Sequence, residues 1–122
     1  MTIYKLKTFA RFARNEDISD KSLAEAVERA ERGLVDASLG GGLIKQRVAR
    51  KGRGRSGGYR VMVAFRAGDF ALFLFGFAKS AQDNLDDRQV KLLRAFAASW
   101  LSADATTIKR AVEQGELVEM IK

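Results

Sequence analysis

The stretch that decides the fold is "LIKQRVARKGRGRSGGYRVMVAFRAGDFALFLFGFAKS", Leu43 to Ser80. It contains two runs in which the side chains alternate in character, a third run that is apolar throughout, and glycine-containing segments between them. A period of two is typical of β-strands, because successive side chains point to opposite faces of a sheet. We therefore predict three consecutive antiparallel strands, Leu43–Ala49, Tyr59–Arg66 and Phe70–Phe77, which form a meander.

The alternation separates cationic side chains from apolar ones. On the first predicted strand, Lys45 and Arg47 share one face, while Ile44 and Val48 share the other. The second strand places Tyr59, Val61, Val63 and Phe65 on one face and Arg60, Met62, Ala64 and Arg66 on the opposite face. The third strand is apolar on both faces, which is typical of a central strand covered on both sides.

Helices are predicted on both sides of the meander. Before it, "TIYKL" (2–6) suits a short strand, and apolar residues at helical spacing predict a hairpin of helices Lys7–Asn15 and Asp20–Leu34. After it, residues 85–101 and 104–114 predict two more helices, and "ELVEMIK" (116–122) is either a short strand or a fraying tail.

The predicted fold class is therefore α+β, with the N-terminal helical hairpin packed on a small antiparallel meander sheet and two extra C-terminal helices. At 122 residues, the chain is expected to form a single domain over residues 1–122. We expect its core to occupy about residues 1–80 and a C-terminal helical extension to occupy about residues 84–115.

Positive charge is concentrated in the meander. The formal net charge is +7, and no acidic residue occurs between Asp36 and Asp69, although that window holds eight Lys and Arg residues. The rest of the chain has 14 basic and 15 acidic residues and is nearly neutral. Localised charge indicates a surface that binds a polyanion, because clustered cations attract phosphates and displace counterions. The alternative is a solvated basic loop without a partner.

The composition also excludes several kinds of chemistry. The chain has no cysteine and no histidine, so it lacks disulfides, thiolate nucleophiles and the commonest metal ligand, and we expect no metal and no cofactor. The segment "GRGRSGG" does not match a nucleotide-binding P-loop, because a strand follows it rather than a helix. No apolar run is long enough to span a membrane, and the N-terminus lacks a secretory signal. We expect a soluble, cytoplasmic protein without a membrane partner.

Individual residues of the basic stretch have competing interpretations. Three cations side by side on one sheet face, Lys45, Arg47 and Arg60, require either exposure to solvent or contact with phosphates. Tyr59 offers an aromatic ring for stacking on a base, but its position on the Val61 face favours core packing. Trp100 has the helical spacing of a core residue rather than of a base-binding platform.

The same stretch resembles the toxins of bacterial RelE/RelB-type toxin–antitoxin modules, in the RelE/ParE superfamily. The similarity is closest to a HigB-like branch with the pattern LIK-x-R-[IV]-A-R-x-G-x-G-[KR]-SGG-[YF]-R, then a hydrophobic strand and "GFAK". The resemblance implies a compact microbial-ribonuclease-like fold. It also implies an mRNA endoribonuclease that blocks translation, depends on the ribosome, and is neutralised by a cognate antitoxin.

The resemblance also implies roles for individual residues. Catalytic groups would be Lys45 and Arg47 in "LIKQR", Arg60 in "GYRV" and Lys79 in "GFAK", all cations that hold mRNA and stabilise the cleavage transition state. Flanking RNA-binding residues would be Arg50, Lys51, Arg53, Arg55 and Tyr59. An acidic antitoxin segment is expected to lie across the sheet near Lys45, Arg60 and Lys79.

The chain departs from the family pattern at the acid–base group. Many relatives use a Tyr or His near the last strand, whereas this chain has no His and no Tyr after Tyr59. Proton transfer would fall to Lys45, Tyr59, Lys79 or groups of the ribosome, and Asp83 is the nearest carboxylate. Two alternatives stay open: a non-catalytic toxin of the same fold that inhibits DNA gyrase, as in the ParE branch, and a basic RNA-binding module. Arg60 has a structural alternative as well, an ion pair with Asp69.

Overall fold

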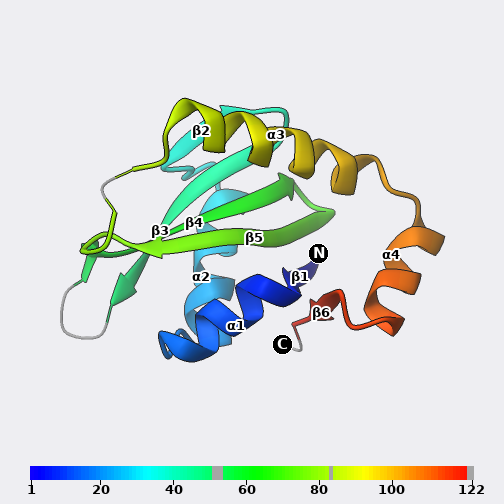
Figure 1. The fold of residues 1–122 in the computed structure, drawn as a ribbon, viewed down its shortest axis with the longest axis horizontal. Coiled ribbons are helices and arrows are strands. Elements are labelled where there is room, and N and C mark those ends of the chain that lie inside the picture. The colour runs from blue at the N-terminus through cyan, green and yellow to red at the C-terminus, as the bar shows by residue number, and fades with distance from the viewer. Residues whose placement is uncertain (51–53, 83, 121–122) are drawn as a thin grey trace.

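The computed structural model describes residues 1–50, 54–82 and 84–120. Figure 1 shows a curved sheet with helices on both faces. In chain order, the elements are β1 Thr2–Leu6, α1 Lys7–Asn15, α2 Asp20–Glu31, β2 Ala37–Gly40, β3 Leu43–Arg50, β4 Gly54–Arg66, β5 Phe70–Ala78, α3 Asp87–Ser102, α4 Ala105–Glu113 and β6 Leu117–Glu119. The α+β class and the three predicted strands of the meander are confirmed.

The sheet has six strands in the order β2-β3-β4-β5-β1-β6. Strands β2 to β5 pair antiparallel in succession, and β6 pairs antiparallel with β1. The prediction of an entirely antiparallel sheet is wrong at β1, which pairs parallel with β5, Thr2 opposite Phe70. A parallel pair needs a long crossover connection, and the helices and strands between β1 and β5 supply it.

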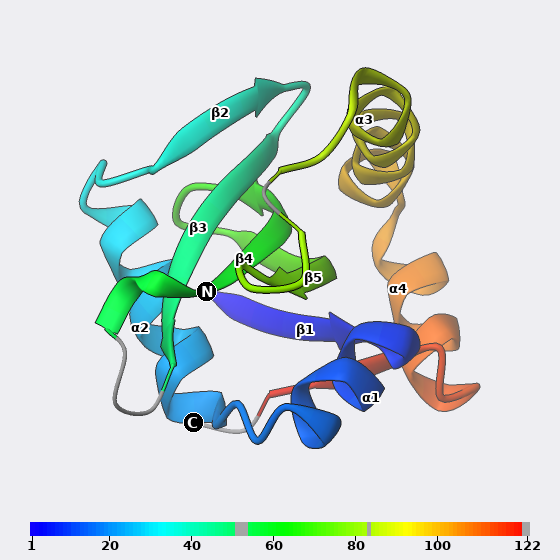
Figure 2. The same cartoon turned by 60° about the vertical axis from the view of Figure 1, so that its left-hand side comes forward.

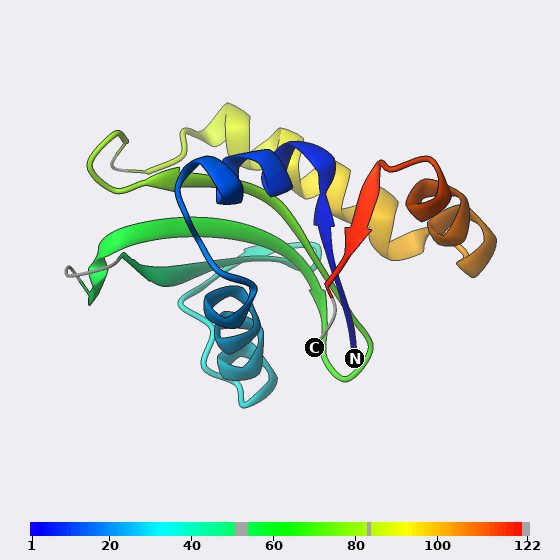
Figure 3. The same cartoon turned by 90° about the horizontal axis from the view of Figure 1, so that it is seen from below.

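Helices α1 and α2 lie on one face of the sheet, where α1 contacts β5 and α2 contacts β3, while α3 lies on the other face (Figure 2). The predicted helical hairpin is not what the structure contains. In Figure 3, α2 is viewed nearly along its axis while α1 runs across the view, so the two helices do not lie antiparallel. Each helix packs on its own strands because the curved sheet offers α1 and α2 separate surfaces.

Each face of the sheet therefore carries its own hydrophobic core. The α1/α2 face buries Phe9, Leu23, Val48, Tyr59 and Phe73, among others. The α3/α4 face buries Leu43, Met62, Leu72, Phe77 and Trp100, among others. Burial of β5 side chains on both faces confirms its prediction as a central strand, and Trp100 is a core residue, as its spacing predicts.

A bulge in β5 changes which residues face α3. Met62 pairs with Phe75 and Val63 pairs with Phe73, so Leu74 has no partner residue on β4. The extra residue shifts the alternation, and Leu74 and Phe75 both pack against the core on the α3 side. Beyond the bulge, Phe77 lies opposite Arg60 on that same side of the sheet.

Candidate functional site

The strand register brings the predicted catalytic residues onto one face. Arg47 on β3 lies directly opposite Arg60 on β4, and Lys45 lies opposite Met62. Directly opposed residues of antiparallel strands point to the same side of a sheet, and Met62 belongs to the core on the α3 side. The cations therefore lie on the sheet face that α3 partly covers.

Lys79 extends this group at the end of β5. Its backbone N–H donates to the carbonyl oxygen of Gly58 at 2.9 Å, which continues the pairing of β4 and β5 past Ala78. Alternation then places Lys79 on the side of Phe77 and Arg60. We call Lys45, Arg47, Arg60 and Lys79 the basic sheet face. None of the four residues is fully buried, and Arg47 is exposed.

The loop from β5 to α3 borders the basic sheet face. The Lys45 ammonium donates to Asn84 Oδ1 at 3.2 Å, and the Arg50 guanidinium lies 3.4 Å from Ser80 Oγ. Helix α3 begins three residues after Asn84, with Asp86 as its N-cap in a capping box with Gln89. The cap fixes where α3 starts and so limits how far the helix extends over the sheet.

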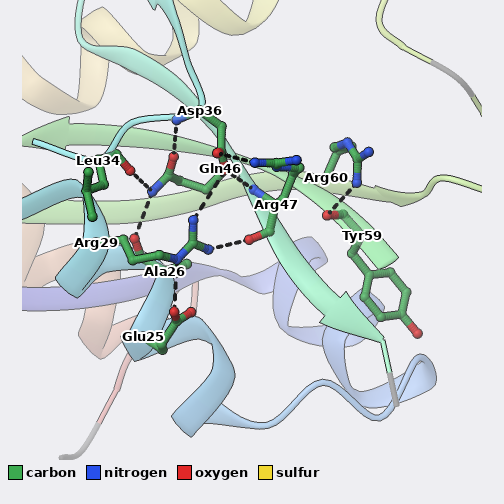
Figure 4. A network of polar contacts seen from close by, with 9 residues as sticks. All are labelled: Glu25, Ala26, Arg29, Leu34, Asp36, Gln46, Arg47, Tyr59 and Arg60. Carbon is green, nitrogen blue, oxygen red and sulfur yellow. Dashed lines mark hydrogen bonds and ion pairs between the residues drawn. The ribbon is translucent and has the colours of Figure 1, made fainter. Parts of the chain in front are cut away.

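A network of hydrogen bonds and ion pairs around Asp36 and Arg29 holds Arg47 in place (Figure 4). Asp36 accepts from the Arg47 backbone N–H at 2.7 Å and from its guanidinium at 3.2 Å. The buried Arg29 guanidinium lies 3.3 Å from the same carboxylate and also donates to the Arg47 carbonyl oxygen and to Glu25. Arg47 thus keeps a defined orientation at an otherwise exposed position.

The network has electrostatic consequences for Asp36. Partial burial raises the pKa of Asp36, but the hydrogen bonds and positive charge of Arg47 and the hydrogen bond from Arg29 outweigh it, and the pKa lies below its ordinary value of 3.8. The buried side chain of Gln46 accepts from the Asp36 backbone N–H at 2.7 Å and donates to the Ala26 and Leu34 carbonyl oxygens. Sequence reasoning missed Arg29, Asp36 and Gln46. The polar Gln46 on the apolar face of β3 was the available signal.

Tyr59 does not lie on the basic sheet face. Figure 4 shows Tyr59 and Arg60 pointing to opposite sides of β4. The Tyr59 ring is 3% exposed, its hydroxyl donates to the Glu16 carbonyl oxygen at 3.2 Å, and the Arg50 guanidinium lies 5.6 Å from its ring centroid. Burial is the main cause that raises the pKa of Tyr59.

The remaining candidates lie in or near the glycine-rich connection. Lys51, Arg53 and Asp83 fall outside the residues that the structure describes, and Arg55 lies in β4 with only its backbone described. Position 58 requires glycine because β3 approaches it too closely for a side chain. A Cβ there would lie 2.1 Å from the Val48 carbonyl oxygen. Asp69, the alternative partner for Arg60, forms an ion pair with Arg66 at 2.7 Å.

Two absences apply to the described parts of the chain. Within residues 1–50, 54–82 and 84–120, no group of three or more acidic or other metal-ligating side chains is placed to hold a metal ion. In the same ranges, no helix has both the length and the apolar character needed to cross a membrane.

Comparison of the sequence with known proteins identifies the family of the chain. A search of curated proteins found no relative that matches the chain. The sequence model described as "RelE toxin of RelE / RelB toxin-antitoxin system" matches residues 1–120, which include the basic sheet face, α3 and α4. A match over nearly the whole chain implies a toxin with a cognate antitoxin as its partner. The chain therefore belongs to the RelE toxin family.

Proposed function

We propose that this toxin is an mRNA endoribonuclease and that the basic sheet face binds and cleaves the RNA. The observation that carries the proposal is the register that sets Arg47 opposite Arg60 and Lys45 opposite Met62, with Lys79 at the end of the neighbouring strand. Two directly opposed arginines repel each other, and a phosphate between them relieves the repulsion. Asp36 forms an ion pair with Arg47, and the clustered cations of neighbouring strands suit a phosphate group.

The proposed reaction is attack of a ribose 2′-hydroxyl on the adjacent phosphate, which requires RNA. Negative charge develops on the phosphorus-bound oxygens in the transition state. Guanidinium groups stabilise that charge through paired hydrogen bonds, and ammonium groups act as point charges. We assign the first role to Arg47 and Arg60 and the second to Lys45 and Lys79. The ion pair with Asp36 orients Arg47 before RNA arrives.

Proton transfer falls to a lysine or to the ribosome in this proposal. Tyr59 is poorly suited as a base, since its hydroxyl is bonded to Glu16 on the opposite side of β4 and its pKa is raised, chiefly by burial. Lys45 lies on the correct face, and its ammonium is already held by Asn84. A ribosomal group would supply the second proton-transfer partner if cleavage depends on the ribosome.

The test is cleavage of mRNA by the Arg60→Ala variant, in cells and with purified ribosomes. We expect the rate to fall about 100- to 1,000-fold, as for removal of one group that stabilises a transition-state anion. Arg60→Lys should restore little, because the bidentate fork is lost. Arg11→Ala removes an exposed cation from α1 on the other face and serves as the control. Wild-type cleavage by a folded Arg60→Ala protein would refute the assignment.

A gyrase inhibitor of the same fold is the second candidate, which the absence of histidine favours. Expression of the wild-type protein in cells distinguishes the endoribonuclease from the gyrase inhibitor. An endoribonuclease leaves cut mRNA within minutes of induction, whereas a gyrase inhibitor arrests growth with intact mRNA and changes DNA supercoiling. An RNA-binding module would bind RNA without doing either.

A further inference from the structure

The outer face of α3 carries exposed apolar side chains. Leu92 is 66% exposed and Phe96 is 41% exposed, and they are one helical turn apart. The helix packs on the sheet through Ala97 and Trp100, and Phe96, one turn before Trp100, lies at the border between the packed side and the outer face. Large apolar residues one turn apart on a solvent-facing helix are typical of a protein-binding surface rather than of ordinary solvated helix.

The C-terminal half of α3 lacks charged side chains. The segment "AFAASWLSA" (95–103) contains no charged residue. Its exposed members besides Phe96 are small: Ala95, Ala98, Ser99 and Ser102. Small residues between two large apolar ones allow a second helix to approach closely. We call Leu92, Ala95, Phe96 and Ser99 the α3 docking face.

Phe96 is already fixed in position. Its ring meets the ring of the buried Trp100 edge-on, with centroids 6.3 Å apart. An aromatic side chain that is held in place before binding loses little conformational freedom when a partner covers it. Such residues are the usual anchors of protein interfaces.

Charge indicates what kind of partner fits. From Arg88 to Ala103 the chain has no acidic residue, and Arg88, Lys91 and Arg94 are all exposed. Arg94 is anchored by its hydrogen bond to the Leu39 carbonyl oxygen at 2.8 Å, so its charge stays near the edge strand β2. An acidic partner complements this rim. A second copy of the chain, with a net charge of +7, does not.

We propose that the antitoxin docks an acidic amphipathic helix on the α3 docking face, with its apolar stripe on Leu92 and Phe96 and its carboxylates against Arg88 and Lys91. The inference rests on the toxin–antitoxin part of the proposed function and not on RNA cleavage. The N-terminal end of α3 follows the loop whose Asn84 contacts Lys45. A segment that continues past this end of the helix therefore reaches the basic sheet face.

The experiment measures binding of the purified toxin to the antitoxin of the same operon. We expect the double variant L92S/F96S to raise the Kd about 30-fold or more, as for truncation of interface anchors. When expressed in cells, this variant should still arrest growth, and the antitoxin should no longer reverse the arrest. Leu34→Ser is the matched control, because Leu34 is 56% exposed and lies outside α3.

Further variants keep the test decisive. Ser99→Glu adds bulk and a negative charge to the docking face without removing a core contact, and it should weaken binding of an acidic helix even if the double variant loses stability. R88E/K91E should slow association and reduce its salt dependence. Unchanged antitoxin affinity in both L92S/F96S and Ser99→Glu would overturn the proposal. So would a wild-type toxin that dimerises alone and becomes monomeric in L92S/F96S, because the face would then belong to a second copy.

The same experiment separates this inference from the RNA-cleavage proposal. Loss of antitoxin affinity on changing the docking face supports the inference whether or not the toxin cuts RNA. A wild-type protein without nuclease activity would remove the proposed chemistry and leave the binding result intact.

Discussion

At the scale of single residues, Asp36 connects the buried interior to the basic sheet face. Its carboxylate is bonded to the Arg47 backbone and guanidinium and lies beside buried Arg29. A buried arginine that loses its carboxylate partner is costly, because its charge is then removed from water without compensation. Asp36 therefore supports both the stability of the chain and the orientation of Arg47.

Replacing Asp36 with Ala should lower the free energy of unfolding by about 2 kcal/mol, the typical loss for hydrogen bonds to charged groups. Glu25 remains on Arg29 and limits the damage. Denaturant unfolding measures the change. Asp20→Ala is the control, since Asp20 makes an exposed pair with Lys5 at 2.8 Å, and it should cost clearly less.

Acid should remove the stabilisation that Asp36 provides. Its folded pKa lies below the ordinary value of 3.8, so the contribution is complete above that pH and is lost as the pH falls through the folded pKa. We expect the difference in unfolding free energy between wild type and Asp36→Asn to shrink below about pH 4. A difference that stays constant from pH 7 to pH 2 would contradict this view.

Gly58 should not tolerate a side chain. The Cβ of Gly58→Ala would meet backbone atoms of Val48 and Arg50, which cannot move without separating β3 from β4. We expect a loss of about 1–3 kcal/mol, as for overpacked sites. Gly76→Ala is the informative comparison. There the nearest atoms belong to the side chains of partly exposed Phe12 and buried Phe9 rather than to backbone, so we expect the loss to be smaller.

At the scale of elements, the strands of the meander were predictable because their alternation is strong, and α3 and α4 because their spacing is helical. Strand β2 was not, since Ala37–Gly40 is four residues long and ends in glycine. The β5 bulge was also hidden, because an apolar run gives no sign of where the alternation shifts. The alternation of the strands was enough to place Lys45, Arg47 and Arg60 on one face. The ion pair between Asp36 and Arg47 could not be predicted, because it depends on how separate segments of the chain pack together.

The capping box of α3 gives a prediction at this scale. Asp86→Ala removes the side-chain acceptor for the Gln89 backbone N–H at 2.8 Å and should cost about 1 kcal/mol. For a chain of this size, the loss corresponds to a fall in Tm of roughly 4 °C. Asp87→Ala removes the neighbouring carboxylate but not the cap, and thermal unfolding should show a smaller change.

At the scale of the whole molecule, the excess positive charge is concentrated in residues 37–68. Part of it lies on the basic sheet face, which α3 covers only in part. Replacing Arg50, Lys51, Arg53 and Arg55 with Ala should weaken RNA or ribosome binding and reduce its salt dependence by up to about one unit of slope per lost phosphate contact. The control removes the same charge elsewhere, from Arg11, Arg14, Lys21 and Arg32. Equal effects of the two sets would mean that net charge, not its location, governs binding.

The position of β1 in the sheet has a consequence for how the toxin is made. Strand β1 precedes the other described strands in the chain and lies between β5 and β6, so its two pairings join residues 2–6 to residues 70–73 and 117–119. Contacts between such distant parts of a chain form slowly, because a long loop must close before they gain any stability. The last pairing cannot form until residue 117 has emerged from the ribosome. The sheet of the newly made toxin is therefore completed only after residues 117–119 have emerged, and until then one side of β1 lacks its β6 partner.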